Sequence, residues 1–139
     1  MRQYPYQVIS TNPNVPPAPI LCVTLICPGQ TRDRVYELDA FLDTGADVTL
    51  IPLEAVSILR LPLLDERVPV MGVGGAITRG FLCKTAIQFG PIALSLVNVI
   101  ACEAVAIGGQ NQMIVGRDIL NRCCVRFDGQ RRMFAFEVD

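Results

Sequence analysis

The stretch FLDTGADVTLIP, residues 41–52, places an ionisable side chain inside an apolar frame. Asp43 follows two apolar residues and precedes a turn of small residues. Because a carboxylate is costly to remove from water, its side chain is expected to point into open space at the end of a strand. Gly45 permits unusual dihedral angles and a close backbone approach. On this tripeptide alone, an Asp that caps an ordinary turn is the simpler interpretation, since short motifs arise by chance.

The length and composition of the chain predict one folded domain. It has 139 residues, of which 51% are hydrophobic and 18% charged, so a packed core is expected. The formal net charge of −1 gives no case for binding nucleic acid or an anionic membrane. The apolar runs are too short to span a bilayer, and the N-terminal residues lack the apolar core of a signal peptide. We therefore expect a cytoplasmic protein without nucleic-acid or membrane partners.

The six cysteines mostly lie in apolar runs, and the chain contains no histidine. No CxxC pair occurs, and adjacent cysteines such as Cys123 and Cys124 do not fit the usual spacing of zinc ligands. Reduced core cysteines are therefore expected, with no metal and no cofactor. The lack of histidine excludes serine and cysteine proteases that depend on a His base. Any catalysis has to use carboxylates, Lys, Tyr or water.

Four prolines within residues 11–20 mark the organisation of the chain. They predict an extended N-terminal arm over residues 1–19, partly ordered as an edge strand around residues 4–10. The folded domain then covers residues 20–139. Its signals are mostly β, and we expect a small barrel-like domain with short helical pieces.

The expected elements follow from alternating or continuous apolar patterns. Strands are predicted at residues 20–27, 34–42, 47–51, 92–100 and 113–115, with two more around a Gly-rich tip within residues 66–89. Short helices are predicted at residues 52–59, where a proline suits the first turn, and at residues 116–122. A hairpin is predicted at residues 123–138, with its turn at Asp128 and Gly129.

Several motifs together resemble the retropepsins, the retroviral type of aspartic protease. The stretch at residues 41–52 is similar to their active-site loop, in which two hydrophobic residues precede Asp-Thr/Ser-Gly-Ala. VMGVGGAITR (residues 70–79) resembles the glycine-rich flap, MIVGRDIL (113–120) the stretch leading into the helix, and CCVRFDGQ (123–130) the strand that follows. The resemblance implies a retropepsin-like acid-protease barrel with one short C-terminal helix, a flap hairpin and a terminal β-hairpin, and it suggests cellular or prokaryotic members.

The resemblance also implies roles for the active-site loop. Asp43 matches the catalytic aspartate, Thr44 the residue that interlocks two such loops, and Gly45 the glycine that lines the substrate cleft, while Ala46 keeps the turn small. Asp47 and Arg117 match a structural ion pair, and an Asp–Arg pair can be bidentate and fix a loop. Two independent surface charges are the alternative for this pair.

The flap expectation rests on residues 70–79. Val73 matches the apolar flap tip, and Met71 stands where many relatives carry another glycine. A plain hairpin turn is the alternative. The flap and substrate-binding residues implied by the resemblance are Met71, Gly72, Val73, Gly74, Gly75 and Ile77. Val48 and, more weakly, Ile114 are further candidates to line the subsites.

One Asp-Thr-Gly in a chain this short implies two subunits. An aspartic protease needs two carboxylates that share a site, one protonated and one ionised. A symmetric homodimer with one Asp43 from each subunit supplies them, and the substrate is then an extended peptide or protein. The terminal hairpin either contributes to the dimer surface or folds onto its own subunit.

The leading functional hypothesis is an aspartic endopeptidase in which water is activated between two Asp43 carboxylates. The alternative is a catalytically silent retropepsin-like module used for dimerisation or peptide binding. An intact Asp-Thr-Gly-Ala loop favours the enzyme, whereas Met71 in the flap favours the silent module. Self-cleavage within residues 1–20 is a further hypothesis.

Overall fold

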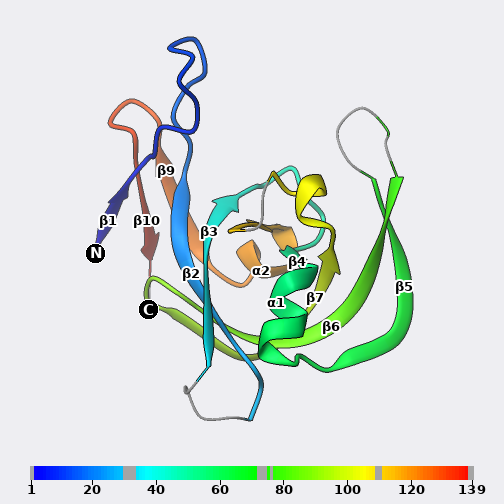
Figure 1. The fold of residues 1–139 in the computed structure, drawn as a ribbon. Helices are drawn as coiled ribbons and strands as arrows, with labels where there is room; N and C mark the ends of the chain where they lie inside the picture. The colour runs from blue at the N-terminus through cyan, green and yellow to red at the C-terminus, as the bar shows by residue number, and fades with distance from the viewer. Residues whose placement is uncertain (1, 30–33, 72–74, 76, 109–110, 138–139) are drawn as a thin grey trace.

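A seven-stranded sheet that closes on itself forms the body of the protein (Figure 1). The structure is a computed structural model, and it describes residues 2–29, 34–71, 75, 77–108 and 111–137. The strand order is β2-β3-β8-β4-β7-β6-β5, and β2 also pairs with β6, which closes the barrel. The strands are β2 (Ile20–Ile26), β3 (Val35–Leu42), β4 (Leu50–Pro52), β5 (Leu63–Met71), β6 (Ile77–Phe89), β7 (Ile92–Cys102) and β8 (Gln112–Val115). The mostly β, barrel-like fold predicted from the sequence is confirmed.

Strand β3 shows how the pattern of the sequence divides core from surface. Leu38, Ala40 and Leu42 are buried, and the residues between them are exposed, as the period of two requires. The parallel partner β8 continues this arrangement, with Met113 and Val115 buried in the same core. The outer face of β3 therefore leads directly to Asp43, two residues beyond Phe41.

Three short helical segments are α1 (Leu53–Leu59), η1 (Ala104–Ala106) and α2 (Arg117–Leu120). Helix α1 begins after Pro52 and ends at Arg60 in the left-handed conformation, with φ of 53°. It buries Ala55, Val56 and Leu59 against the barrel. Within the described residues, these helices are too short to cross a membrane.

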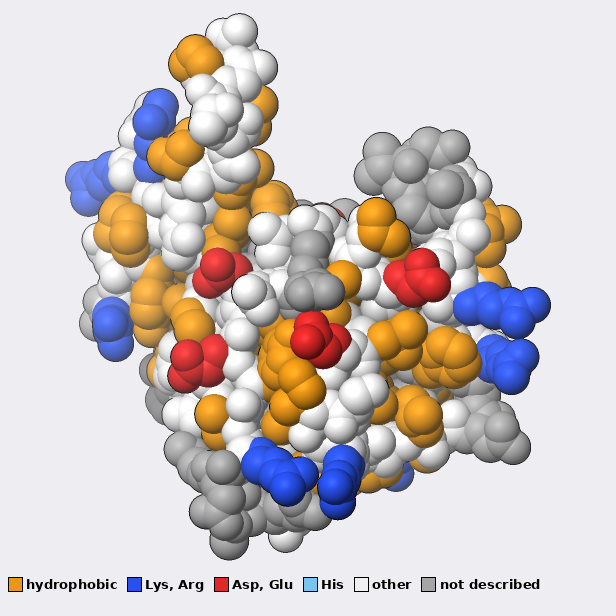
Figure 2. All heavy atoms as spheres, in the orientation of Figure 1, with side chains coloured by type: hydrophobic (Ala, Val, Ile, Leu, Met, Phe, Trp, Pro, Cys, Tyr) orange, Lys and Arg blue, Asp and Glu red, His pale blue; other side chains and the backbone are white. Residues whose placement is uncertain are grey.

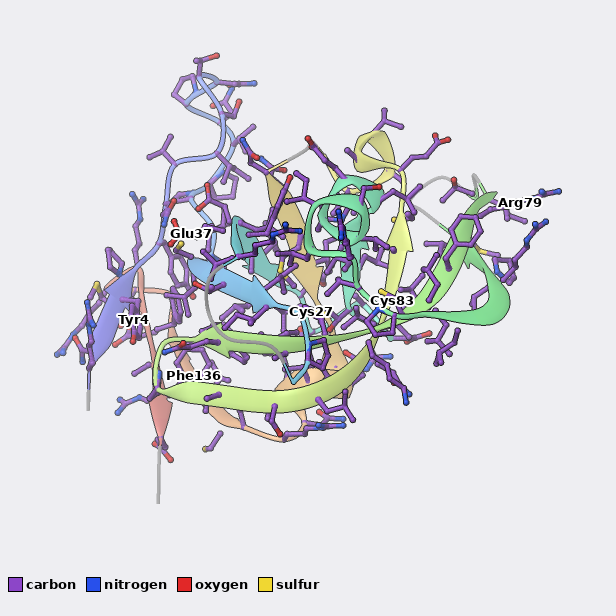
Figure 3. All side chains as sticks on the ribbon, turned by 60° about the horizontal axis from the view of Figure 1, so that its bottom comes forward. Tyr4, Cys27, Glu37, Arg79, Cys83 and Phe136 are labelled. Atoms are coloured by element: carbon purple, nitrogen blue, oxygen red, sulfur yellow. The ribbon has the colours of Figure 1, made fainter. Side chains whose placement is uncertain are left out.

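A second, three-stranded sheet carries both ends of the described chain. Its order is β1 (Gln3–Pro5), β10 (Met133–Glu137) and β9 (Cys124–Asp128). Strand β1 is shorter than the edge strand expected around residues 4–10. Phe134 and Phe136 are buried, with the Tyr4 ring 5.4 Å from that of Phe134 and the Phe89 ring 5.5 Å from that of Phe136. Figure 3 shows Tyr4 and Phe136 on neighbouring strands, and their rings lie 6.1 Å apart. The apolar side of the terminal hairpin thus packs onto its own chain, and a contribution of the hairpin to a dimer surface stays a prediction.

The Pro-rich segment turns back on itself. Gln7 and Ala18 form an antiparallel bridge, in which the Gln7 N–H donates to Ala18 O at 2.8 Å and the Ala18 N–H to Gln7 O at 2.9 Å. We call residues 7–18 the arm hairpin. It projects from the same side of the barrel as the free end of the β5–β6 hairpin and the carboxyl end of β3 (Figure 1).

Candidate active site

Asp43 lies where the chain leaves β3, on a tight turn held by main-chain bonds. Its N–H donates to Val115 O at 2.9 Å, which extends the parallel pairing of β3 with β8 by one bond. Its Oδ1 accepts the Gly45 N–H at 2.8 Å, and its carbonyl accepts the Ala46 N–H at 3.2 Å. The half-buried carboxylate is therefore fixed in direction while it stays open to solvent.

Arg117, the first residue of α2, fastens this turn from the other side. Its N–H donates to Ala46 O at 2.9 Å, and its Nη1 donates to Thr44 O at 2.7 Å. Its Nη2 forms an ion pair with Asp47, as the sequence motif implied. The Asp47 side chain is 83% exposed. Because exposed ion pairs contribute about 0–1 kcal/mol, the pair orients the loop more than it stabilises the fold.

The sequence did not predict a hydrogen-bonded cluster behind the turn, which joins the buried Thr49 and Gly116 to the exposed Asp118. The Thr49 hydroxyl donates to Asp118 Oδ1 at 2.7 Å and accepts the Gly116 N–H at 3.1 Å. Asp118 Oδ2 accepts the Thr49 N–H at 3.0 Å, and its Oδ1 also accepts the Ile119 N–H at 2.9 Å. The signal was a threonine inside the apolar run VTLI, whose hydroxyl needs a partner once buried.

Gly116 permits the close packing of the two loops. A Cβ at this position would lie 2.5 Å from Val48 O and 3.0 Å from Ala46 O. Both are backbone oxygens and cannot rotate away, so the contact requires a residue without a side chain. Glycine is required here for space and not for its dihedral freedom, because its φ of −91° is open to other residues as well.

A groove of about 420 Å³ opens beside Asp43. Ile20, Phe41 and Ile114 lie side by side across β2, β3 and β8, since the register pairs Ile20 with Phe41 and Phe41 with Ile114. Asp43 lies two residues beyond Phe41 and also lines the groove. Figure 2 shows the surface hollowed between the arm hairpin and the described part of the β5–β6 hairpin.

The other residues expected at the site are distributed as follows. Thr44 and Gly45 are exposed on the loop, where a second chain can reach them. Met71 and Ile77 are exposed at the end of the β5–β6 hairpin and pair with each other, and Gly75 has a φ of 81°. Gly72, Val73 and Gly74 lie outside the described residues. Val48 lines a different depression, with Leu96 and Asp118, so in the single chain only Ile114 of the two further subsite candidates borders the groove.

The buried thiols are chemically quiet. Burial raises the pKa of Cys83 to about 12, and burial together with the nearby Glu103 raises that of Cys102 to about 11. These groups stay protonated at neutral pH, and the thiolate is the reactive form. Within the described part of the chain, no three potential metal-ligating residues come together.

Comparison with known families identifies the class of protein. The model of the aspartyl protease family matches residues 28–119, more than half of the chain, so the chain belongs to this family. The matched segment contains both halves of the loop assembly described above, from Asp43 to Arg117. A comparison with curated protein sequences gives no match.

Solved structures place the fold within the retropepsin-like group. EIAV protease in complex with the inhibitor HBY-793 superposes with a TM-score of 0.52 at 21% identity, over 82% of this chain and 93% of that chain. The retroviral protease-like domain of Ddi1 from Leishmania major gives a TM-score of 0.50 at 16% identity, over 85% of this chain and 88% of that one. These likenesses establish the retropepsin-like fold.

Proposed function

We propose that the protein is an aspartic endopeptidase that works as a homodimer, with one Asp43 from each subunit. The observation that carries this proposal is the presentation of Asp43 on a turn braced by Arg117, beside a groove with an apolar row of residues on its floor. An acid that merely caps a turn needs neither the brace nor the groove. Family membership supports peptide hydrolysis as the reaction class.

The chemistry requires the two carboxylates to differ in protonation. Two like charges at short distance do not both ionise cheaply, so one proton is shared by the pair. The ionised carboxylate accepts a proton from water as the water oxygen bonds to the scissile carbonyl carbon. The protonated one donates its proton to the carbonyl oxygen. The carboxyl group that accepted the proton from water then gives it to the amide nitrogen, the C–N bond breaks, and a hydroxyl proton of the tetrahedral intermediate returns to the other carboxylate, which restores the starting pair.

A substrate suited to this geometry is an extended peptide with apolar residues near the cut. The β5–β6 hairpin projects from the same side of the barrel as the carboxyl end of β3 (Figure 1), and we assign it the role of a flap that closes over the peptide, with Met71 and Ile77 at its described end. Thr44 and Gly45 are exposed where the second loop has to meet the first.

The decisive experiment is digestion of a peptide library across pH by the wild type and by Asp43→Asn. The variant is expected to lose cleavage and to remain a folded dimer by sedimentation. Glu37→Gln is the matched control, because Glu37 is an acid on the outer face of β3 away from the groove. Cleavage retained by Asp43→Asn refutes the mechanism, and peptide binding without cleavage by the wild type identifies a silent binding module.

A further inference from the structure

We propose that the arm hairpin is a wall of the substrate site, and that Val8 and Ile9 select the apolar side chain bound next to the scissile bond. This inference rests on the proposed function and extends it to a segment outside the residues matched by the family model, which begin at residue 28. The substrate class that it names is a peptide with a large apolar residue beside the cut.

The part of the groove floor next to Asp43 is apolar, while Gln7, Asp39 and Gln112 add polar groups elsewhere in the lining. Ile20, Phe41 and Ile114 form one row across three neighbouring strands. Successive outward residues of a strand lie about 7 Å apart, so a group resting on Phe41 is within one residue of Asp43. A peptide whose carbonyl is held at Asp43 therefore presents the adjoining side chain to this row.

Val8 and Ile9 line the groove together with this floor. They belong to the arm next to β2, since Gln7 Nε2 donates to Ile20 O at 3.2 Å. Ile107 borders the groove too, and it packs in the cluster of Leu50 and Ile100 with Ile114 against it. The groove is thus bounded by the arm near β2 and by the segment after η1 near β8.

The apolar side chains of the arm remain largely exposed to solvent in the single chain. Val8 is 81% exposed and Ile9 is 48% exposed, whereas Ile107 is buried. Groove volumes of a few hundred Å³ suit a small apolar ligand group, and the 420 Å³ here accommodate a large side chain. Filling the groove would remove both arm side chains from water, which gives the arm a direct share of the binding free energy.

The arm is held firmly enough to discriminate between side chains. Strand β1 pairs with β10, and the Tyr6 N–H donates to Arg132 O at 2.8 Å just before the hairpin starts. The Gln7–Ala18 bridge closes its base. Prolines at 13, 16 and 17 restrict its loop, which lowers the entropy lost when a ligand orders it.

The first test compares cleavage by the wild type, by the double variant Val8→Ser/Ile9→Ser and by Ile58→Ser. Ile58 is 45% exposed on α1 and does not border the groove, so it matches Ile9 in exposure. For a peptide with Phe or Leu beside the cut, kcat/KM should fall roughly tenfold in the double variant, mostly through KM, and stay unchanged in the control. Ile9→Trp should shift the preference toward Ala or Val, because the larger ring narrows the groove. An unchanged cleavage profile in both arm variants overturns the proposal.

The second test does not depend on catalysis. Asp43→Asn is irradiated with an apolar hexapeptide that carries p-benzoylphenylalanine at a central position, and the cross-linked residue is mapped by mass spectrometry. Cross-links to Val8 or Ile9 support the arm as a wall; cross-links elsewhere, or none, overturn it. A contact between subunits is the other explanation for the exposed arm residues, and sedimentation of Val8→Ser/Ile9→Ser at several concentrations tests it. Dissociation of this variant into monomers would make the arm a subunit contact and overturn its role in selection. Activity that survives in Asp43→Asn would refute the proposed function independently.

Discussion

Replacing Thr49 by Val tests the hydrogen-bonded cluster that joins the active-site loop to α2. Thr49 is 0% exposed, and its hydroxyl is bonded to both Asp118 Oδ1 and the Gly116 N–H. Valine has nearly the same shape, so the substitution removes these two bonds without opening a cavity. The Thr49 N–H keeps its bond to Asp118 Oδ2, which confines the change to the hydroxyl.

The magnitude follows from the groups left behind. The Gly116 N–H becomes a buried donor without a partner, which costs about 1–3 kcal/mol, and the lost bond to a carboxylate is worth a further 1.5–3 kcal/mol or so. The added methyl group returns about 0.8 kcal/mol. A net loss of roughly 2–5 kcal/mol is expected, a large share of the stability of an ordinary domain. For a chain of this size it corresponds to a fall in Tm of roughly 10 °C.

Thermal and urea unfolding, followed by circular dichroism, measure this loss. The control is Thr24→Val, because Thr24 lies on the outer face of β2 and is half-buried. If Thr49→Val unfolds within about 0.5 kcal/mol of the control, the cluster is not what fastens the loop. Loss of peptidase activity with unchanged stability would also contradict the reasoning, since the hydroxyl touches no substrate.

Three further substitutions probe the packing of the candidate site, the terminal hairpin and the barrel core. Gly116→Ala should destabilise by more than about 2 kcal/mol in urea, because its Cβ meets backbone at 2.5 Å, whereas Gly129→Ala, with open space around it, should be neutral. Phe136→Ala should cost about 3–5 kcal/mol and Phe127→Ala, which is 39% exposed, much less; equal losses would show that the terminal hairpin is not packed on its own chain. The raised pKa of Cys83 means that the folded state keeps a proton that the unfolded thiol loses above pH 9. Stability should therefore fall between pH 9 and 12 by up to about 1.4 kcal/mol per pH unit, and Cys83→Ala should flatten that slope in denaturation curves.

Local patterns in the sequence predicted the elements well, because alternation and turn residues act over a few positions. The alternation around Leu38 and Leu42 located β3, and Pro52 located the start of α1. The pairing of β2 with β6 had no such signature, since it joins residues that are far apart in the sequence, such as Val23 and Phe89. A hairpin pattern likewise looks the same whether its apolar side meets its own chain or another, so only the structure placed Phe134 and Phe136 in the core.

The residues of the candidate site that belong to a sequence motif could be predicted, whereas those whose role depends on burial could not. Asp43, Asp47 and Arg117 followed from the loop motif, and the last two form the expected ion pair. Thr49 was passed over because a threonine in a short strand is ordinary at a surface, and its full burial depends on the packing of α2. The proline content of the arm predicted an extended segment, but composition does not specify which of its backbone groups pair with each other.

The bonds that shape the active-site loop all lie within one chain. Val115 O accepts the Asp43 N–H, and Arg117 donates to the carbonyl oxygens of Thr44 and Ala46. In the proposed homodimer, association therefore brings together two loops that are already formed in each chain. Because preorganised groups lose little freedom when the reaction begins, the work of building the site is done by folding. The exposed Asp47–Arg117 pair orients the loop, while the hydrogen bonds of the buried Thr49 side chain hold the loop to α2.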